Sequence, residues 1–355
     1  MKKKEPINNT LLLMSIAIGI FICMYAFAMI ALGGGFLKVQ QFFDLLNDNA
    51  FLIVLGCALT IVMIGGGINI SVGGVVCLTV MACALYLNNP GIENNTLTII
   101  VMLLIALGIG LAFGIGQGFL ISYLQIQPFI VTLAGMFLSR GLTTMLSVNP
   151  VKITHEGFLA LIKNKLQIPF LGYVAKNGNL IPAKLEIGAI TALCIVVITW
   201  FMLKKIKLGR NIYAIGGNQQ SALMLGINVK RTRFLSYVIS GLLSGLAGFI
   251  YLMHMPAGKA GVATASEMDA IAASIIGGTL LTGGVGNVFG TFFGVLILAT
   301  IKKIIIVSPL NDSWWQDMAS GALLGFFILL QSVVLSSREK ARARKSTAKA
   351  AVQRE

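Results

Sequence analysis

Polar side chains that could hold a ligand are scarce in this chain of 355 residues, of which 57% are hydrophobic and 11% charged. The glycine-rich stretch GGGINISVGG (65–74) places Asn69 and Ser71 among apolar residues. A polar group in such surroundings is costly unless it has a hydrogen-bonding partner or faces a watery cavity. Two interpretations follow: these side chains join neighbouring helices, or they line a pathway for a polar solute.

A second polar group begins with Glu267 and Asp269 in SEMDAIAASIIGGTLLTGG (266–284). Carboxylates in the first turn of a helix are stabilised by the helix dipole, which is the purely structural interpretation. The functional interpretation is that Asp269 points into the same pathway as nearby hydroxyl groups. We predict that the residues lining this pathway are Asn69, Ser71, Thr132, Asp269, Ser274 and Thr279.

The side chains that usually perform catalysis form no recognisable arrangement in the sequence. His155 and His254 are isolated, and we find no paired carboxylates, nucleophile–base pair or cluster of metal ligands. The five cysteines lie singly in apolar runs, and no Walker-type phosphate loop occurs. The sequence therefore predicts no enzyme activity, metal site or cofactor, and favours a transporter or channel.

Apolar runs of about 20 residues recur along the chain, each long enough to cross a hydrocarbon core of roughly 30 Å. They predict an all-α, polytopic transmembrane bundle of about ten spans within residues 11–336. Glycine-rich stretches join the second span to the third and the eighth to the ninth, which makes these pairs candidates for broken or re-entrant helices. The expected spans are 11–32, 50–66, 70–88, 97–123, 127–147, 187–204, 233–254, 268–283, 286–305 and 315–336.

Three apolar stretches carry small residues four positions apart, a spacing that lets helices approach closely. Tight helix packing is therefore the favoured interpretation of these glycines. The repeats are Gly110/Gly114/Gly118, Gly241/Gly245 and Gly286/Gly290/Gly294. Arg140 lies inside a predicted span, and we expect it to reach an interface or to cap neighbouring carbonyls.

The formal net charge of +15 is concentrated at Lys2–Lys4, at residues 204–234 and after residue 336, next to apolar spans. The positive-inside rule explains this distribution without nucleic acid. We expect both the N-terminal segment 1–10 and the tail 337–355 to be cytoplasmic. The tail is either a solvated segment or a contact for anionic membrane lipid. The loop 148–186 is then exterior, with a short helix expected near 157–165.

The polar segment 205–232 joins two predicted spans on the cytoplasmic side. Asn218 is a suitable N-cap, QQSALML can form about two helical turns, and Gly226 is suited to ending them. We expect this helix to expose Ala222, Leu223 and Leu225. A short, weakly charged helix just outside a membrane suits docking in a groove of a soluble partner, and an ordinary interfacial loop is the alternative.

This segment resembles the cytoplasmic coupling loop of bacterial sugar ABC-importer permeases of the ribose/galactose/xylose type. Three further stretches resemble that family in the same order, so the resemblance covers about residues 45–335; they are GGINISVGG, QPFIVTLAGMFLSRG (127–141) and MDAIAASIIGGTLLTGGVGNVFGTFFGVLI (268–297). Within the family, the chain resembles permeases of galactofuranose importers through TLAGMFLSRG, YAIGGNQQSALMLGI and SWWQDMASGALLGFFILLQ. The resemblance assigns coupling to an ATPase to Arg210, Tyr213, Gly217, Asn218, Ala222, Leu225 and Gly226.

The resemblance implies an inner-membrane permease subunit that moves a monosaccharide inward by ATP-driven alternating access. Its implied partners are a cytoplasmic ATP-binding subunit, an exterior sugar-binding protein and a second permease chain, identical or related. The family usually has Asp where this chain has Asn69, which puts in doubt any role that needs a carboxylate there. The alternatives are a secondary sugar transporter, which would normally carry ionisable groups at mid-membrane, and a non-transporting membrane scaffold.

Overall fold

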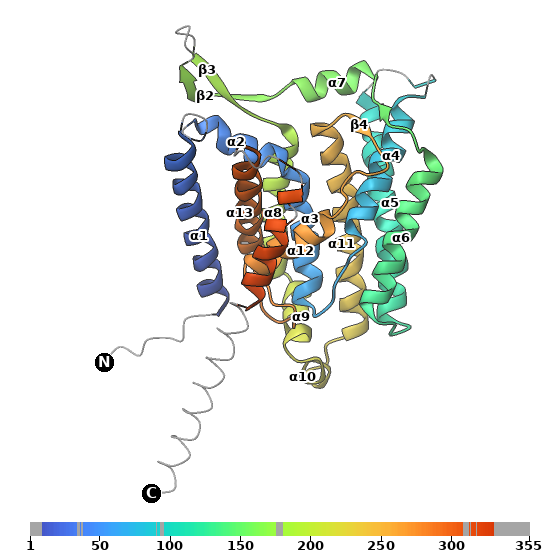
Figure 1. Cartoon of the computed structure of the whole chain (residues 1–355). Coiled ribbons are helices and arrows are strands. Elements are labelled where there is room, and N and C mark those ends of the chain that lie inside the picture. Colours follow the sequence, from blue (N-terminus) through green and yellow to red (C-terminus); the bar gives the residue numbers. More distant parts are fainter. Residues whose placement is uncertain are drawn as a thin grey trace, which may run out of the picture.

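The computed structural model describes residues 9–33, 36, 38–89, 91, 92, 96–174, 180–307, 312, 314–316 and 318–329. They form a bundle of helices with two small antiparallel sheets (Figure 1). The labelled helices are α1 (Asn9–Leu32), α2 (Val39–Asp48), α3 (Ala50–Ile64), α4 (Val72–Leu87), α5 (Thr96–Ser122), α6 (Pro128–Leu146), α7 (Glu156–Lys163), α8 (Ile187–Lys205), α9 (Lys207–Gly217), α10 (Gln219–Met224), α11 (Val229–His254), α12 (Ser266–Ile276) and α13 (Val288–Val307). Residues 314–316 and 318–329 are also helical. The strands are β1 (Val151–Lys152), β2 (Leu166–Val174), β3 (Leu180–Leu185) and β4 (Ala257–Gly258).

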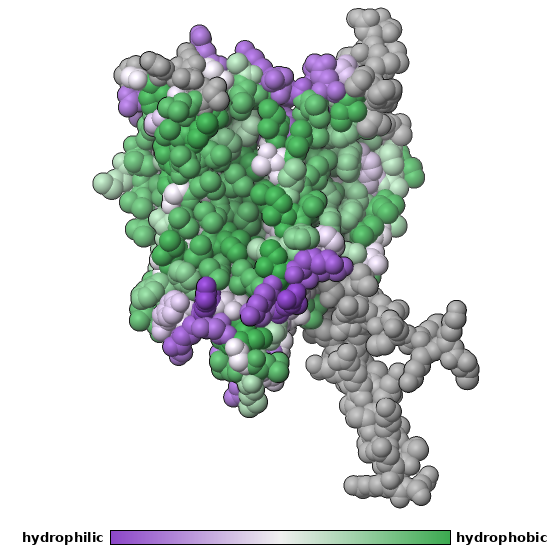
Figure 2. Space-filling view, turned by 180° about the vertical axis from the view of Figure 1, so that it is seen from behind, coloured by the Kyte–Doolittle hydropathy of each residue, from purple (hydrophilic) through white to green (hydrophobic). Residues whose placement is uncertain are grey.

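An apolar belt covers the side of the bundle between two more polar ends (Figure 2). Within the described part of the chain, five helices are long and apolar enough to cross a membrane, namely α5, α6, α8, α11 and α13. The helices α2 and α3 provide a sixth candidate if they are taken as one span bent by 56°. The architecture is that of a helical, multi-pass membrane protein.

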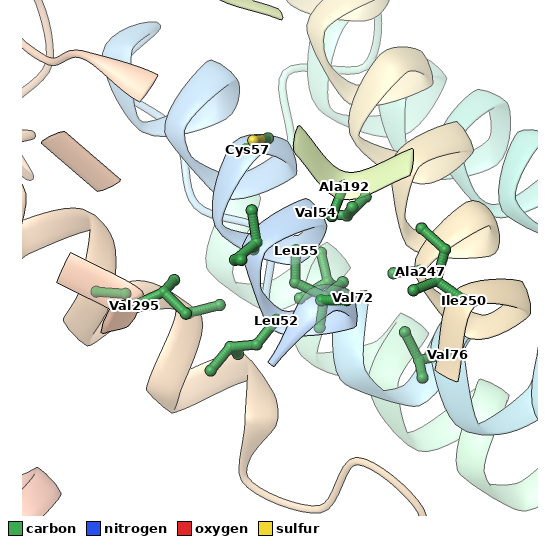
Figure 3. Packing of buried hydrophobic residues seen from close by; sticks show 14 of the residues in the cluster. Leu52, Val54, Leu55, Cys57, Val72, Val76, Ala192, Ala247, Ile250 and Val295 are labelled. Atoms are coloured by element: carbon green, nitrogen blue, oxygen red, sulfur yellow. The ribbon is translucent and has the colours of Figure 1, made fainter. Parts of the chain in front are cut away.

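The core of the bundle forms around α3, in which every residue except Phe51 is buried. A helix that is apolar on all faces belongs in the interior of a bundle. Leu52 and Leu55 of α3 lie among side chains from α4, α8, α11 and α13 (Figure 3). This central helix therefore contacts most of the elements that surround it.

Glycines allow neighbouring helices to meet at their backbones, as the four-residue spacing predicts. Where α5 crosses α11, a Cβ at Gly110 would collide with the carbonyl of Gly241. Where α12 meets α13, a Cβ at Gly290 would collide with the carbonyl of Gly277. The predicted close packing of these stretches is confirmed.

The helices α3 and α12 both end in regions where we predict broken or re-entrant helices. Between α3 and α4 the chain forms a loop in which Gly66 has a φ of +76°. After the 11-residue helix α12, a second loop has positive φ at Gly278, Gly283 and Gly284. The predicted helix 268–283 is therefore wrong in its second half, because the chain there turns through conformations that favour glycine.

The two ends of the bundle carry different elements, and we name them accordingly. At the hairpin end, β2 pairs with β3, β1 pairs with β4, and α7 lies nearby (Figure 1). At the opposite α10 end lie α9 and α10. The helix expected near 157–165 is confirmed as α7, whose N-cap His155 accepts a hydrogen bond at Nδ1 from the backbone N–H of Phe158.

Most predicted spans match observed helices within a few residues, and the predicted helical bundle is confirmed, with two small antiparallel sheets added to it. The sequence does not predict α2, whose polar residues interrupt the apolar pattern, nor the hairpin within the loop 148–186. The count of ten spans stays a prediction, since five or six candidates occur in the described residues. Residues 1–8, 330–336 and the tail 337–355 lie outside the described residues, and the cytoplasmic location of both termini also stays a prediction.

Candidate functional site

The predicted loop 205–232 is helical over most of its length. After α8 ends at Lys205, Ile206 is extended and α9 runs in a new direction. Arg210 Nη1 donates to the carbonyl of Lys205 at 3.0 Å and so satisfies one of the acceptors left open where α8 ends. The Tyr213 hydroxyl donates to the carbonyl of Gly286 at 2.7 Å, and burial raises the pKa of Tyr213 to about 12. Tyr213 thereby ties α9 to the loop before α13.

The end of α9 fits against both breaks in the bundle. The backbone N–H of Gly284 donates to the carbonyl of Ile64, the last residue of α3, at 2.8 Å. Gly216 lies so close to this pair that no Cβ would fit, and a Cβ on Gly284 would lie 2.7 Å from the Cα of Gly217. The end of α9 is therefore in direct contact with the end of α3 and with the loop before α13.

The short helix α10 projects beyond α9 at the same end (Figure 1). Asn218 Oδ1 accepts a hydrogen bond from the backbone N–H of Ser221 at 2.9 Å, which makes it the N-cap. Gly226 follows with a φ of +75°, a conformation that favours glycine after a helix. Both expectations for the ends of this helix are confirmed.

Large apolar side chains on α10 face away from the protein. Leu223, Met224 and Leu225 are 53%, 88% and 78% exposed. The expectation that Ala222 is exposed is wrong: it is buried against Ile215 and Val229, because the helix needs an inward face to pack on α9 and α11. α10 thus presents an unusually apolar outer surface.

The charge around α10 is of one sign. Residues 187–266, which include α8 to α11, contain no Asp or Glu. Lys204, Lys205, Lys207 and Lys230 are exposed there. Beside α10 lies a cleft of about 280 Å³, whose lining includes Gln125, Gln127, Gln219, Leu223 and Arg233. The α10 end therefore combines positive charge with exposed apolar surface, which suits contact with another macromolecule.

The polar residues at the first break form a hydrogen-bond network. Asn69 Nδ2 donates to Ser240 Oγ of α11 at 3.0 Å, and Asn69 Oδ1 accepts from the Ser71 hydroxyl at 2.7 Å. Gln117 Nε2 of α5 lies 2.8 Å from Ser71 Oγ. Asn69 and Ser71 are 2% and 1% exposed. The network fixes the loop before α4 against α5 and α11.

The other predicted pathway residues lie in different places. Thr132 donates to the carbonyl of Pro128 in its own helix α6, at 2.9 Å. Ser274 of α12 donates to the carbonyl of Ala270 at 2.9 Å and lies 3.3 Å from Thr60 of α3. Thr279 is buried in the loop that follows α12. The structure therefore joins Asn69 to Ser71, and places Ser274 and Thr279 with α12.

Two ion pairs attach the first turn of α12 to other helices. Asp269 Oδ2 lies 2.6 Å from Lys302 Nζ of α13. Glu267 lies 3.3 Å from Arg140 Nη2 of α6. Arg140 Nη2 also contacts the carbonyl of Ala263 at 3.4 Å, which agrees with the capping role expected for it. Lys303, next to Lys302, pairs with Asp48 of α2 at 3.4 Å.

Sequence reasoning misses the partners in these contacts. Gln117 and Ser240 contribute to the network at the break, and Lys302 pairs with Asp269. Each partner is separated from its counterpart by between 33 and 171 residues. A polar residue within an apolar helix is the one signal that points to them. In the described residues, no group of three His, Cys, Asp or Glu is arranged to hold a metal ion.

The end of α9 contacts both breaks of this multi-pass helical bundle, and α10 projects beyond it from a basic surface. This arrangement fits the class of transport permeases. The model of the family described as the permease component of branched-chain amino acid transport systems matches residues 41–328. The chain belongs to this family. No solved structure matches it.

Curated relatives support the assignment across most of the chain. An inner membrane ABC transporter permease protein of Escherichia coli, YjfF, is 37% identical over 89% of this chain and 90% of its own length. The fructose import permease protein FruG of Bifidobacterium longum is 33% identical, over 94% and 95%. The ribose import permease protein RbsC of Escherichia coli is 34% identical, over 85% and 88%. The predicted similarity to sugar ABC permeases and the location in the cytoplasmic membrane are confirmed.

Proposed function

We propose that this chain is the permease subunit of an ATP-binding-cassette importer that carries a monosaccharide inward, with galactofuranose as the specific sugar. The observation that carries the proposal is the exposed helix α10 on a basic surface, joined through α9 to both breaks in the bundle. Relatives named for the import of fructose and ribose support a sugar as the substrate. The chain itself performs no ATP hydrolysis.

In this mechanism a cytoplasmic ATP-binding subunit binds the outer face of α10, including Leu225. The length of this helix and its position on the protein are set by Asn218, Ala222 and Gly226. Movement of the ATPase shifts α9, and the shift reaches the break after α3 and the loop before α13 through Gly217 and Tyr213. Arg210 holds α9 to the end of α8. The helices then alternate between outward-open and inward-open arrangements.

The pathway follows the broken helices, with its polar lining contributed by Asn69, Ser71, Thr132, Asp269, Ser274 and Thr279. Most of these groups are neutral and exchange hydrogen bonds, which suits a hydroxylated solute. Ten spans place both termini in the cytoplasm. An exterior sugar-binding protein delivers the sugar at the hairpin end, and a second permease chain completes the pathway.

Uptake into vesicles tests this function. The permease is reconstituted with its ATP-binding and sugar-binding subunits, and entry of labelled galactofuranose, D-galactose, D-ribose and D-fructose is measured with ATP or a non-hydrolysable analogue inside. We expect uptake only with hydrolysable ATP. Uptake driven by an ion gradient without the ATP-binding subunit would indicate a secondary transporter instead, and a complete lack of uptake would favour a scaffold.

A further inference from the structure

Arg140 and Glu267 meet at the seam between α6 and α12, where the first turn of α4 lies behind them. Arg140 Nη2 lies 3.3 Å from both carboxylate oxygens of Glu267, and Nη1 lies 3.4 Å from the Thr264 hydroxyl. Tight charge-assisted hydrogen bonds measure about 2.7–2.9 Å. The guanidinium is therefore loosely held, in contrast to the 2.6 Å pair between Asp269 and Lys302.

The pair is accessible from one side only. The side chain of Arg140 is 23% exposed and that of Glu267 is 8% exposed. Thr264, beside them, is exposed. The surrounding surface of α6 is apolar, with Phe137 and Leu138 64% and 58% exposed. A charged pair and a hydroxyl therefore open onto an otherwise hydrophobic lateral face.

Glycines at the start of α4 hold this arrangement in place. A Cβ at Gly73 would collide with the Glu267 carboxylate, and a Cβ at Gly74 would collide with the hydroxyl of Ser139 on α6. Both flanking helices thus approach the α4 backbone directly. The carboxylate is fixed from behind while the guanidinium remains free to adjust.

The hydrogen-bonding groups of Arg140, Glu267 and Thr264 are complementary to the hydroxyl groups of a polyol. A guanidinium offers five N–H donors, a carboxylate offers about four acceptor sites, and a hydroxyl offers both functions. Neighbouring hydroxyl groups of a sugar need donors and acceptors side by side. Because the contacts of Arg140 are long, a sugar hydroxyl can replace one of them without the loss of a strong bond.

We propose that Arg140, Glu267 and Thr264 form a subsite that binds hydroxyl groups of the transported sugar as it passes along the seam between α6 and α12. This subsite rests on the proposed function, since it requires a sugar to cross the protein. It lies towards the hairpin end, because Arg140 is less than two turns from the end of α6.

The test compares sugars with their monodeoxy analogues in the reconstituted complex. ATP-dependent uptake of galactofuranose, D-galactose, D-ribose, D-xylose and D-fructose is measured beside analogues that each lack one hydroxyl. The variants are Thr264→Val and Arg140→Lys, which keep the site nearly intact in size and charge. Thr144→Val is the matched control, because this exposed threonine donates to the carbonyl of Arg140 within α6.

In the wild type, we expect at least one analogue to enter more slowly than its parent sugar. The ratio of the parent's uptake rate to the analogue's uptake rate should shrink at least about fivefold in Thr264→Val and Arg140→Lys. Discrimination by the sugar-binding protein is the same in all variants and cancels. The subsite is overturned if this ratio of uptake rates is the same in all four proteins, even if every uptake rate falls. The four proteins are the wild type, Thr264→Val, Arg140→Lys and Thr144→Val. If the wild type shows no ATP-dependent uptake of any of these sugars, the proposed function fails and the subsite with it.

Discussion

The hairpin end and the α10 end of the bundle use charged residues in opposite ways. At the hairpin end, Glu186 lies 2.8 Å from Lys165 and 2.9 Å from the Nδ1 of His254. Asp48 pairs with Lys303, and Asn47 bridges α2 to the backbone around Glu186. These contacts cross-link α2, α8, α11, α13 and the hairpin, so the charges of Glu186, Asp48 and their partners are satisfied within the chain.

At the α10 end, basic residues have no carboxylate within residues 187–266 to pair with. Met224, the last residue of α10, and Leu225, its C-cap, are apolar and 88% and 78% exposed. One end is therefore closed by contacts within the chain, whereas the other presents basic and apolar surface that suits a partner. Substitutions at the hairpin end should therefore lower stability, and substitutions on α10 should change association.

The largest expected effect at the hairpin end is that of Asn47→Ala. Asn47 is 4% exposed, donates to the carbonyl of Lys184 at 3.2 Å and accepts from the N–H of Glu186 at 2.9 Å. Loss of both bonds at a buried position should cost about 2–4 kcal/mol of unfolding free energy. Asn49→Ala is the control, since the Asn49 side chain bonds the carbonyl of Leu45 one turn earlier. Equal melting temperatures for the two variants would contradict this role.

The ion pairs of Glu186 should make the hairpin end sensitive to acid. Burial raises the pKa of Glu186, but the hydrogen bonds and charges of His254 and Lys165 outweigh it and hold the pKa below its usual value. A carboxyl with a lowered folded-state pKa stabilises the protein above its unfolded-state pKa, and this contribution is lost as the pH falls through the folded-state pKa. Between about pH 6 and about pH 3, the melting temperature should fall more for the wild type than for Glu186→Gln. If the melting temperatures of the wild type and Glu186→Gln fall in parallel with pH, these ion pairs contribute nothing to stability.

The smallest expected effect is local to α10. Asn218→Ala removes the N-cap bond to Ser221 and should cost about 1 kcal/mol of helix stability, or about fivefold in hydrogen-exchange protection of residues 221–224. Asn228→Ala is the matched control, because it removes the equivalent cap from the long, packed helix α11. Protection at the hairpin end should stay unchanged in both. Loss of protection across the whole bundle in Asn218→Ala would contradict the view that α10 is an attached, separable element.

Features encoded by neighbouring residues can be predicted from the sequence. The cap at Asn218, the glycine after α10 and the glycine-rich breaks each depend on a few adjacent positions, and all three are observed. The small-residue spacing also predicts close helix crossings correctly. Local rules are sufficient for these elements because the backbone conformation itself selects the residue type.

Features that depend on distant partners cannot be predicted in this way. The sequence places Asp269 in a pathway or at a helix dipole, and does not reveal its pair with Lys302. The inward position of Ala222 is set by packing on α9 and α11, which the local pattern of QQSALML does not contain. The hairpin is missed because β2 and β3 carry Pro169 and Pro182, which weaken the strand pattern.

Energy coupling at the α10 end is tested most directly by measuring whether α10 binds the ATP-binding subunit. The tagged permease is co-purified with that subunit as wild type, as Leu225→Glu and as Leu166→Glu, the last placing the same change on a 53% exposed leucine at the hairpin end. We predict that Leu225→Glu reduces the recovered ATP-binding subunit at least about tenfold with no change in melting temperature, while Leu166→Glu recovers it fully. Equal recovery with Leu225→Glu and wild type would contradict the claim that this end of the bundle is where energy enters the protein.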